Sequence, residues 1–406
     1  MAIEIRTARE DDLDRVHYLV AYSFTFDRGE EGRKQMKHLE EFAGPATVLL
    51  EDGEIVASLK VYPFTMLVCG APVPLGGVSA VSCLPEARRK GHVGQLLRHS
   101  LEQMHEAGTP LSALYTPHPS LYRKYGWMTA ASNIKFTWHP KRVTAYNPDA
   151  ARGRAVRVTE EDWPLIAGMY ERYSTGRTGQ LVRDEKWWKE AFFRPIYDPE
   201  RKVSDVAVWY DEAGEPSGYL SYASSRDPGP EGSTKVRMRE FVPLTGSAYQ
   251  GLLRFVLTHD LADEIMWYGP IGDPLAYALD DAEQVKREFI DDMMLRVVDI
   301  EKAVAARPTG PGAPDGAFTI AIADAAAPWN QGTWRIECGG GRLSAKKAAG
   351  PGDLSMDAAT FAAVYDGYMK ASEAVRSGLA DGDAVAARLA DRLFASEHPP
   401  NGSDFF

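Results

Sequence analysis

The residues best suited to chemistry stand together at positions 88 to 94, where the chain reads Arg-Arg-Lys-Gly-His-Val-Gly. A β-prone run from Val78 to Cys83 precedes them, and apolar residues at helical spacing follow: Val93, Leu96, Leu97, Leu101 and Met104. The first turn of a helix has unpaired N–H groups and a partial positive charge, so a basic loop that opens a helix suits a pyrophosphate. The alternative is a basic surface loop before an ordinary amphipathic helix.

The kind of phosphate ligand is narrowed by what this loop lacks. It has neither the lysine–hydroxyl pair of a nucleoside triphosphate loop nor the three-glycine spacing of a dinucleotide fold. Coenzyme A therefore fits better than ATP or NAD. The histidines pair with no serine or cysteine in a nucleophile motif, and no spacing predicts a metal site, so we expect none.

Two aromatic segments are the other candidates. Residues 120 to 127 hold Tyr122, Tyr125 and Trp127, a cluster that by itself predicts packing. The sequence closes on Asp404-Phe405-Phe406, and two phenylalanines would be unusual left in water, which favours a buried anchor over a frayed tail.

Composition sets the class of protein. The 406 residues are too many for one ordinary core, so we expect two or three domains, and the 44% hydrophobic fraction is typical of a globular chain. A net charge of −11 gives no general affinity for nucleic acid. Three cysteines without ligand spacing suit a reducing compartment, and neither an apolar signal core nor a membrane-length apolar run occurs. We expect a cytoplasmic protein without a membrane span.

The elements that would position these residues follow a mixed α/β order. Strands are expected at 3–7, 47–50, 55–62, 65–69, 78–83 and 111–115, with an Asp52-Gly53 hairpin turn. Helices are expected over 13–23, after residue 92, and as a short aromatic turn over 120–127.

The middle of the chain repeats the beginning. The segment 156–163 echoes 5–12 as a strand that enters an acidic helix start, and 250–254 echoes 94–98 after a strand-like run from Val236 to Val242. Two echoes in the same order predict duplication of one α/β domain. The second copy has Leu-Thr-Gly-Ser-Ala at 244–248 in place of the arginine-rich loop, so we expect it not to hold a pyrophosphate in the same way.

The amino-acid composition changes again after about Val298, which marks a third part of the chain. Two strand-like runs, 318–322 and 332–338, flank a turn at 327–330, and helical patterns follow over 357–370 and 383–394. This predicts a small α+β module. We therefore expect domains at 1–146, 147–296 and 297–406.

The order of strand, Arg-Arg-x-Gly loop and helix resembles the acetyl-CoA site of the GNAT superfamily of N-acetyltransferases, and the whole chain is similar to its Enhanced intracellular survival family. The resemblance implies tandem GNAT domains, the second degenerate, then a sterol-carrier-protein-like domain, and transfer of an acetyl group from acetyl-CoA to an amine, usually in a hexamer. It implies that backbone groups of Val81, Ser82 and Cys83 hold the pantetheine arm. The amides of the 88–94 loop would hold the pyrophosphate: Arg88, Arg89, Gly91, His92, Val93 and Gly94.

The same resemblance implies two catalytic groups. Tyr122 stands where the family has the general acid that protonates the departing thiolate, and the Phe406 carboxylate where it has the general base. Phe24, Asp27 and Asp404 are candidates for contact with an amine such as an aminoglycoside, a polyamine or a lysine side chain. The rival function is an apolar-ligand-binding protein that uses the sterol-carrier-like domain, with the GNAT core as a scaffold.

Overall fold

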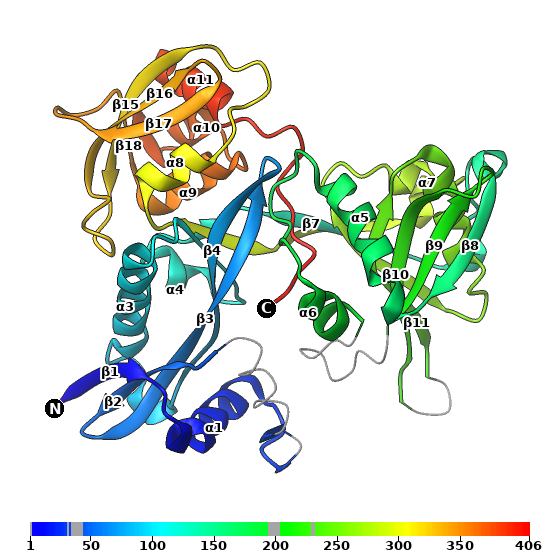
Figure 1. Cartoon of the computed structure of the whole chain (residues 1–406), viewed down its shortest axis with the longest axis horizontal. Helices are drawn as coiled ribbons and strands as arrows, with labels where there is room; N and C mark the ends of the chain where they lie inside the picture. The colour runs from blue at the N-terminus through cyan, green and yellow to red at the C-terminus, as the bar shows by residue number, and fades with distance from the viewer. Residues whose placement is uncertain (1, 31, 34–43, 194–203, 229–231) are drawn as a thin grey trace. The chain divides into compact units, whose positions relative to one another are not determined.

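The protein is described by a computed structural model that covers residues 2–30, 32–33, 44–193, 204–228 and 232–406 (Figure 1). The chain forms two compact units. The first holds Met1–Ala131, Asp292–Pro400 and Phe405–Phe406, and the second holds Ser132–Asp291 and Asn401–Asp404. Within the described part of the chain, no helix has both the length and the apolar character needed to cross a membrane.

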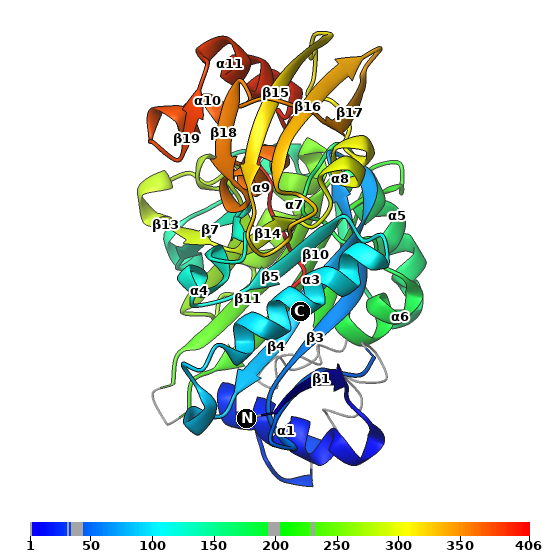
Figure 2. The same cartoon turned by 90° about the vertical axis from the view of Figure 1, so that its left-hand side faces the viewer.

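A seven-stranded sheet carries the N-terminal part of the first unit. Its order is β1 (Ile3–Thr7), β2 (Thr47–Glu51), β3 (Glu54–Val68), β4 (Ala71–Cys83), β5 (Leu111–Tyr115), β14 (Met293–Val297) and β6 (Met128–Thr129). The helices α1 (Leu13–Phe24) and α3 (His92–Glu106) pack on opposite sides of β3 and β4 (Figures 1 and 2). The buried face of α3 carries Leu96, Leu97, Leu101 and Met104, so the predicted helical stripe is confirmed.

One expectation about this sheet was wrong. The two strands expected at 55–62 and 65–69 are one strand, β3, which runs through Pro63. A proline cannot donate to a strand ladder, but β2 pairs with β3 only as far as Leu59. Pro63 pairs in register with Gly76 of β4 on the other side, and the lost N–H therefore interrupts no ladder with β2.

The second unit repeats the same sheet. Its strands, in spatial order, are β8 (Gly153–Val158), β9 (Asp205–Asp211), β10 (Pro216–Arg226), β11 (Thr234–Pro243), β12 (Glu264–Pro270), β7 (Ser132–Trp138) and β13 (Lys286–Asp291). The helices α5 (Trp163–Ser174) and α7 (Gly246–Leu257) stand in the chain where α1 and α3 stand in the first copy. The matching order of strands and helices confirms the duplicated α/β fold.

The two copies exchange one strand each. β7 follows β6 in the chain but pairs with β12 and β13 in the second sheet. β14 follows β13 but pairs with β5 and β6 in the first sheet. A division of the chain into consecutive stretches cannot represent such an exchange, and the expected domain limits at 146 and 296 stay a prediction.

The C-terminal part of the first unit is an α+β module. Its sheet has the order β17 (Arg342–Lys347), β16 (Gly332–Gly339), β15 (Gly316–Ala323), β18 (Leu354–Asp357) and β19 (Ala380–Gly382). The helices of the module are α8 (Ile300–Ala306), α9 (Ala358–Asp366), α10 (Ala371–Arg376) and α11 (Ala384–Leu393). The helix expected over 357–370 ends earlier, at Asp366, because Gly367 adopts a left-handed φ of 82° and terminates it.

Candidate active site

The candidate site begins where two parallel strands separate. β4 and β5 pair only from Leu75–Leu111 to Gly77–Ala113, although both strands continue. Ala80 has a positive φ of 51°, and the register between β3 and β4 shifts beside it, which marks a bulge in β4. The backbone of Val78 to Cys83 therefore has no partner strand on its β5 side among the described residues. Backbone groups of Val81, Ser82 and Cys83 therefore lie on β4 beyond the end of the β4–β5 ladder, and we call this parting of the two strands the opening.

The loop before α3 has the geometry of an anion cradle. Arg89 and Gly91 both take left-handed φ values, 64° and 88°, which turns the chain tightly before the helix. Gly91 is the N-cap of α3, and no side chain caps it, so the amides of the first turn remain available. The amide of Arg88 instead bonds to Pro85 O at 3.2 Å, which narrows the candidate donors to those from Arg89 onward.

Side chains of the loop mainly hold it in place. Arg88 Nε donates to Cys83 O at 3.1 Å, and Lys90 Nζ lies 2.8 Å from Glu51 Oε2. His92 is buried, with Nε2 3.6 Å from Glu51 Oε1. These contacts fix the loop to the end of β4 and to β2. The ring of His92 therefore faces the protein interior, and its contribution to a phosphate site is restricted to its backbone.

Close packing explains the second glycine of the loop. A Cβ at Gly94 would lie 2.0 Å from the hydroxyl oxygen of Tyr125. Only glycine allows the first turn of α3 to lie directly against this tyrosine. Tyr125 therefore packs against the end of the 88–94 loop, which we call the phosphate loop after its expected ligand.

Tyr122 lies on the short helix α4 (Pro119–Arg123), just after β5. Its side chain forms a hydrogen bond with that of Thr116, the residue that follows β5. Burial raises the pKa of Tyr122 to about 12, an effect that the Thr116 hydrogen bond partly opposes. Its ring meets Trp127 edge-on, with 6.4 Å between the ring centroids. The phenol is therefore held firmly and stays protonated.

Phe406 lies where β4 and β5 part. Its Cε2 atom is 2.7 Å from the position that a Cβ would take at Gly77, the last β4 residue paired with β5. The ring lies 4.8 Å from that of Phe64 and 5.2 Å from that of Tyr115, between centroids. Phe406 is buried, as expected of an anchor, whereas Phe405 is exposed and contacts Tyr115. A glycine pair inside a strand, Gly76-Gly77, was the sequence signal for this close approach.

Of the three residues suggested for contact with an amine, Phe24 and Asp27 belong to the first unit and Asp404 to the second. Phe24 is exposed and stacks on Phe26 at the end of α1. Asp27 accepts hydrogen bonds from the amides of Gly29 and Gly32, which lower its pKa and keep it ionised. Both side chains lie at the end of a helix that packs on β3 and β4.

Asp404 differs from the expectation of a substrate-facing acid. In the second unit it is buried, with Oδ1 2.9 Å from Arg183 Nη2 and 3.1 Å from Trp187 Nε1. Arg183 also pairs with Glu240, to which Tyr219 donates at 2.6 Å. Asp404 therefore shares one guanidinium with Glu240, and burial raises the pKa of its carboxyl group above the ordinary value. Nothing in the sequence pointed to Arg183 or Glu240, since Arg183 lies more than fifty positions from each of its two carboxylate partners.

The matching helix start of the second copy is built differently. Thr245 caps α7 by accepting the amide of Ala248 at 3.1 Å. An open cavity of about 590 Å³ lies beside it, lined in part by Leu244, Tyr249 and Tyr277. The first turn of α7 thus uses its own side chain where α3 leaves its amides open.

Comparisons with known proteins agree with this architecture. Residues 4–130 and residues 179–297 each match a family model described as an acetyltransferase (GNAT) domain, and residues 300–401 match a sterol carrier protein domain. The N-acetyltransferase Eis of Mycobacterium tuberculosis is 25% identical over 98% of both chains. An uncharacterized N-acetyltransferase of Streptomyces coelicolor is 27% identical over 80% of each.

Solved structures share the whole fold. A GCN5-related N-acetyltransferase from Anabaena variabilis superposes with a TM-score of 0.87 at 22% identity, with all of both chains covered. Eis1 from Mycobacterium abscessus superposes with a TM-score of 0.79 at 23% identity, also over both full chains. Two GNAT domains, a sterol carrier protein domain and relatives over the full length place this chain in the Eis-like family of GNAT N-acetyltransferases, which makes it an acetyl-CoA-dependent acyltransferase.

Proposed function

We propose that the protein moves the acetyl group of acetyl-CoA to a primary amine by direct attack in a ternary complex at the opening between β4 and β5. The observation that carries the proposal is the position of Phe406 against Gly77, where the two strands part. The acceptor would be an aminoglycoside, a polyamine or a lysine-type amine.

The residues around the opening fit acetyl-CoA. A pantetheine arm is extended and amide-rich, and the bulged backbone from Val81 to Cys83 offers it strand-like hydrogen bonds. The uncapped amides from Arg89 to Gly94 suit a pyrophosphate, aided by the dipole of α3. When bound, acetyl-CoA supplies a thioester whose sulfur can leave.

Tyr122 would act as the general acid. A phenol with a pKa of about 12 is protonated throughout the neutral range, so the donor form is always present. Its hydrogen bond with Thr116 holds it beside the end of β5, on one side of the opening. The short helix α4 is fixed by packing and cannot move the hydroxyl away without disturbing Trp127.

The α-carboxylate of Phe406 would act as the general base. It takes one proton from the acceptor ammonium, directly or through water, and leaves a neutral amine that can attack. The C–N bond forms as the C–S bond breaks. Tyr122 gives its hydroxyl proton to the departing sulfur and regains one from the nitrogen of the new amide. Correct placement of the two reactants would supply much of the acceleration.

The acceptor side of the opening is more aromatic than acidic. Tyr62, Phe64 and Tyr115 surround the terminal ring. Phe24 and Asp27 remain the proposed acceptor contacts at the end of α1. These surroundings favour an amine with an apolar or aromatic body over a highly charged polyamine. From the family resemblance we further propose a homo-oligomer, a hexamer, which light scattering coupled to gel filtration would measure.

A thiol-release assay with acetyl-CoA against aminoglycosides, polyamines, lysine peptides and aryl amines tests the activity. Tyr122→Phe, and separately one alanine added after Phe406, should each lower kcat by about 10²- to 10⁴-fold. The first change removes the proton-donating hydroxyl, and the second moves the proton-accepting carboxylate away. Tyr277→Phe, at an exposed tyrosine of the second unit, is the matched control and should leave kcat unchanged. Wild-type turnover in both test variants would overturn the assigned roles. Calorimetry that shows a fatty acyl ligand bound and acetyl-CoA unbound would favour the rival carrier function.

A further inference from the structure

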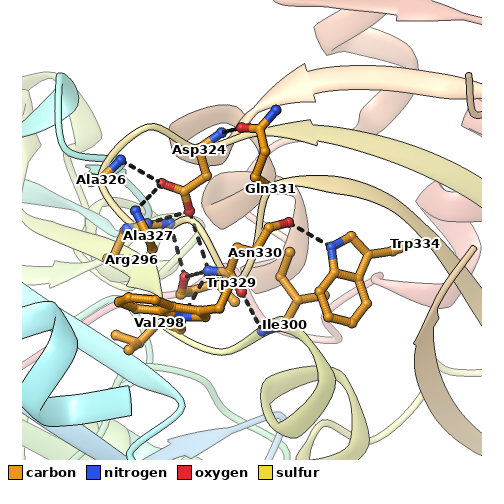
Figure 3. A network of polar contacts seen from close by, with 11 residues as sticks. Arg296, Val298, Ile300, Asp324, Ala326, Ala327, Trp329, Asn330, Gln331 and Trp334 are labelled. Carbon is orange, nitrogen blue, oxygen red and sulfur yellow. Dashed lines mark hydrogen bonds and ion pairs between the residues drawn. The ribbon is translucent and has the colours of Figure 1, made fainter. Parts of the chain in front are cut away.

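The loop between β15 and β16, residues 324–331, forms a dense polar network inside the first unit (Figure 3). We call it the clasp loop. Asp324 Oδ1 accepts the amides of Ala326 and Ala327 at 3.3 and 3.0 Å, and Gln331 Oε1 accepts the Asp324 amide. The loop is therefore ordered by its own first residue.

The clasp loop binds the backbone that leads out of the GNAT sheet. Asn330 Nδ2 donates to Val297 O and Val298 O at 3.2 and 3.0 Å, and Asn330 Oδ1 accepts the Ile300 amide at 3.2 Å. Trp329 Nε1 donates to Val298 O at 2.7 Å. Asn330 is 1% exposed, so these hydrogen bonds are formed away from water. The sterol carrier domain thus holds the end of β14 in a fixed position.

Arg296 connects this network to the turn from Tyr122 to Trp127. It lies on β14, paired with Ser112 of β5, and its Nη2 is 2.5 Å from Asp324 Oδ2. A Cβ at Gly126 would lie 2.7 Å from both Cζ and Nε of Arg296. Gly126 has a φ of 91° and follows directly on the Tyr122–Tyr125 turn. The guanidinium therefore lies against the backbone of the turn that carries the proposed general acid.

Three backbone hydrogen bonds close the turn. The amides of Tyr125 and Trp127 donate to Tyr122 O at 2.9 and 3.3 Å, and the amide of Gly126 donates to Arg123 O at 3.0 Å. The bond from Trp127 is the longest of the three, and it lies directly after Gly126, where side-chain packing adds support to the turn. Arg296 is 1% exposed and occupies that place.

Adhesion between domains does not require a charge pair here. Two buried charges lose their hydration, and apolar residues of similar volume commonly stabilise a protein as well or better. A buried guanidinium that is hydrogen-bonded to a carboxylate on one side is, however, held in a single orientation. That property matters where an atom on the other side must be placed accurately.

We propose that Asp324, acting through Arg296, positions the turn from Tyr122 to Trp127, so that the sterol carrier domain is a positioning element for the general acid of the first GNAT domain. Asp324 and Arg296 are positioning residues and touch no reacting atom. The inference rests on the proposed role of Tyr122.

The test uses the full-length protein. Asp324→Asn places an amide N–H₂ or a weaker acceptor opposite Arg296, and should lower kcat about tenfold while the KM for acetyl-CoA changes less than twofold, since the 88–94 loop is untouched. In a Tyr122→Phe background the same change should have no further effect on kcat. The matched control is Asp353→Asn, which should leave kcat unchanged. Asp353 is exposed, lies in the same domain and accepts a hydrogen bond from the amide of Thr319.

Hydrogen exchange of peptides covering residues 122–127 gives a readout that does not depend on catalysis. Exchange should be faster in Asp324→Asn than in the wild type and unchanged in Asp353→Asn. Arg296→Lys, which keeps the charge but lacks the planar group against Gly126, should show the same kcat loss if Asp324→Asn does not fold. Equal kcat losses with and without Tyr122, or unchanged exchange at 122–127, would overturn the proposal. If Tyr122→Phe has wild-type turnover while exchange at 122–127 is still faster in Asp324→Asn, only the catalytic role of Tyr122 is refuted.

Discussion

Arg183 and Asp404 form a buried ion pair, with 2.9 Å between Nη2 and Oδ1. Asp404 stands two residues before Phe406 in the chain. The network fixes the segment Asn401–Asp404 to the second unit, where Asn133 Nδ2 also donates to Gly402 O. Phe405 and Phe406 belong to the first unit. Each of the two units therefore holds a part of the segment that ends in the proposed base.

Removing the guanidinium from this network should strongly destabilise the protein. Arg183 faces both Glu240 and Asp404, so Arg183→Met leaves two buried carboxylates without a counter-charge. We expect a loss of about 3–5 kcal/mol in the free energy of unfolding, measured by urea denaturation. Asp404→Asn should cost less, because it leaves one guanidinium with one carboxylate.

The matched control is Arg376→Met. Arg376 also pairs with a glutamate, Glu373, but the two side chains are 75% and 50% exposed. Water screens such an exposed pair, so its loss should change the free energy of unfolding little. If Arg183→Met and Arg376→Met shift the urea midpoint equally, the Arg183 network does not hold the tail.

A methyl group at Gly94 should damage the phosphate loop. Gly94→Ala places a Cβ 2.0 Å from the Tyr125 hydroxyl, so the first turn of α3 must shift. We expect a destabilisation of about 1–3 kcal/mol and a raised KM for acetyl-CoA. Gly168→Ala, in α5 with no atom within 4 Å of its Cβ, should instead stabilise by about 0.4–1 kcal/mol. Equal effects of the two changes would rule out the packing argument.

Arg88 should matter for binding acetyl-CoA more than for turnover. Its Nε bonds to Cys83 O, so Arg88→Ala frees the loop from the end of β4 and removes a positive charge. A charge-assisted hydrogen bond contributes about 1.5–3 kcal/mol, which corresponds to about a 10- to 100-fold rise in KM. Steady-state kinetics with varied acetyl-CoA measures this. Arg254→Ala, at an exposed arginine of α7, is the control, and an unchanged KM in Arg88→Ala would contradict the prediction.

The buried carboxyl group of Asp366 should make the free energy of unfolding depend on pH. It is fully buried at the end of α9, neither carboxyl oxygen has a hydrogen-bond partner among the described residues, and burial raises its pKa to about 7. The folded protein therefore keeps this proton up to about pH 7, whereas the unfolded chain loses it near the ordinary value of 3.8. The native state binds more protons in that window, so stability falls as the pH rises from about 4 to 7. The two pKa values correspond to on the order of 4 kcal/mol.

Asp366→Asn should remove this slope and be more stable than the wild type at pH 8, as urea denaturation at pH 5 and pH 8 would show. Asp353 gives the opposite sign, because hydrogen bonds from Thr319 lower its pKa. Its contribution is present above the unfolded pKa and is lost as the pH falls, so Asp353→Asn should weaken the protein at neutral pH. An identical pH dependence in the wild type and Asp366→Asn would exclude a buried neutral Asp366.

Local patterns were sufficient for the parts of the site that lie close together in the chain. The segment from Val78 to Met104 forms the strand, loop and helix that its glycines and apolar spacing predicted. The Asp52-Gly53 turn also forms as expected, with both residues at positive φ. The break expected between residues 62 and 65 was wrong, because a proline such as Pro63 interrupts a strand only where its N–H is needed, and that depends on where a neighbouring strand stops.

The sequence by itself determined the duplicated α/β order, the strand, loop and helix over residues 78–104, and Tyr122 on its short helix, since each element depends on spacing within a few turns or strands. Only the tertiary structure decided that Phe406 meets Gly77, that Arg183 takes up Asp404 and that Arg296 lies behind Gly126. The two residues of each pair are separated by more than a hundred positions, so their contact depends on the sheet order and strand register of the whole fold. Periodicity reports which face of an element is buried, but not which distant element covers it.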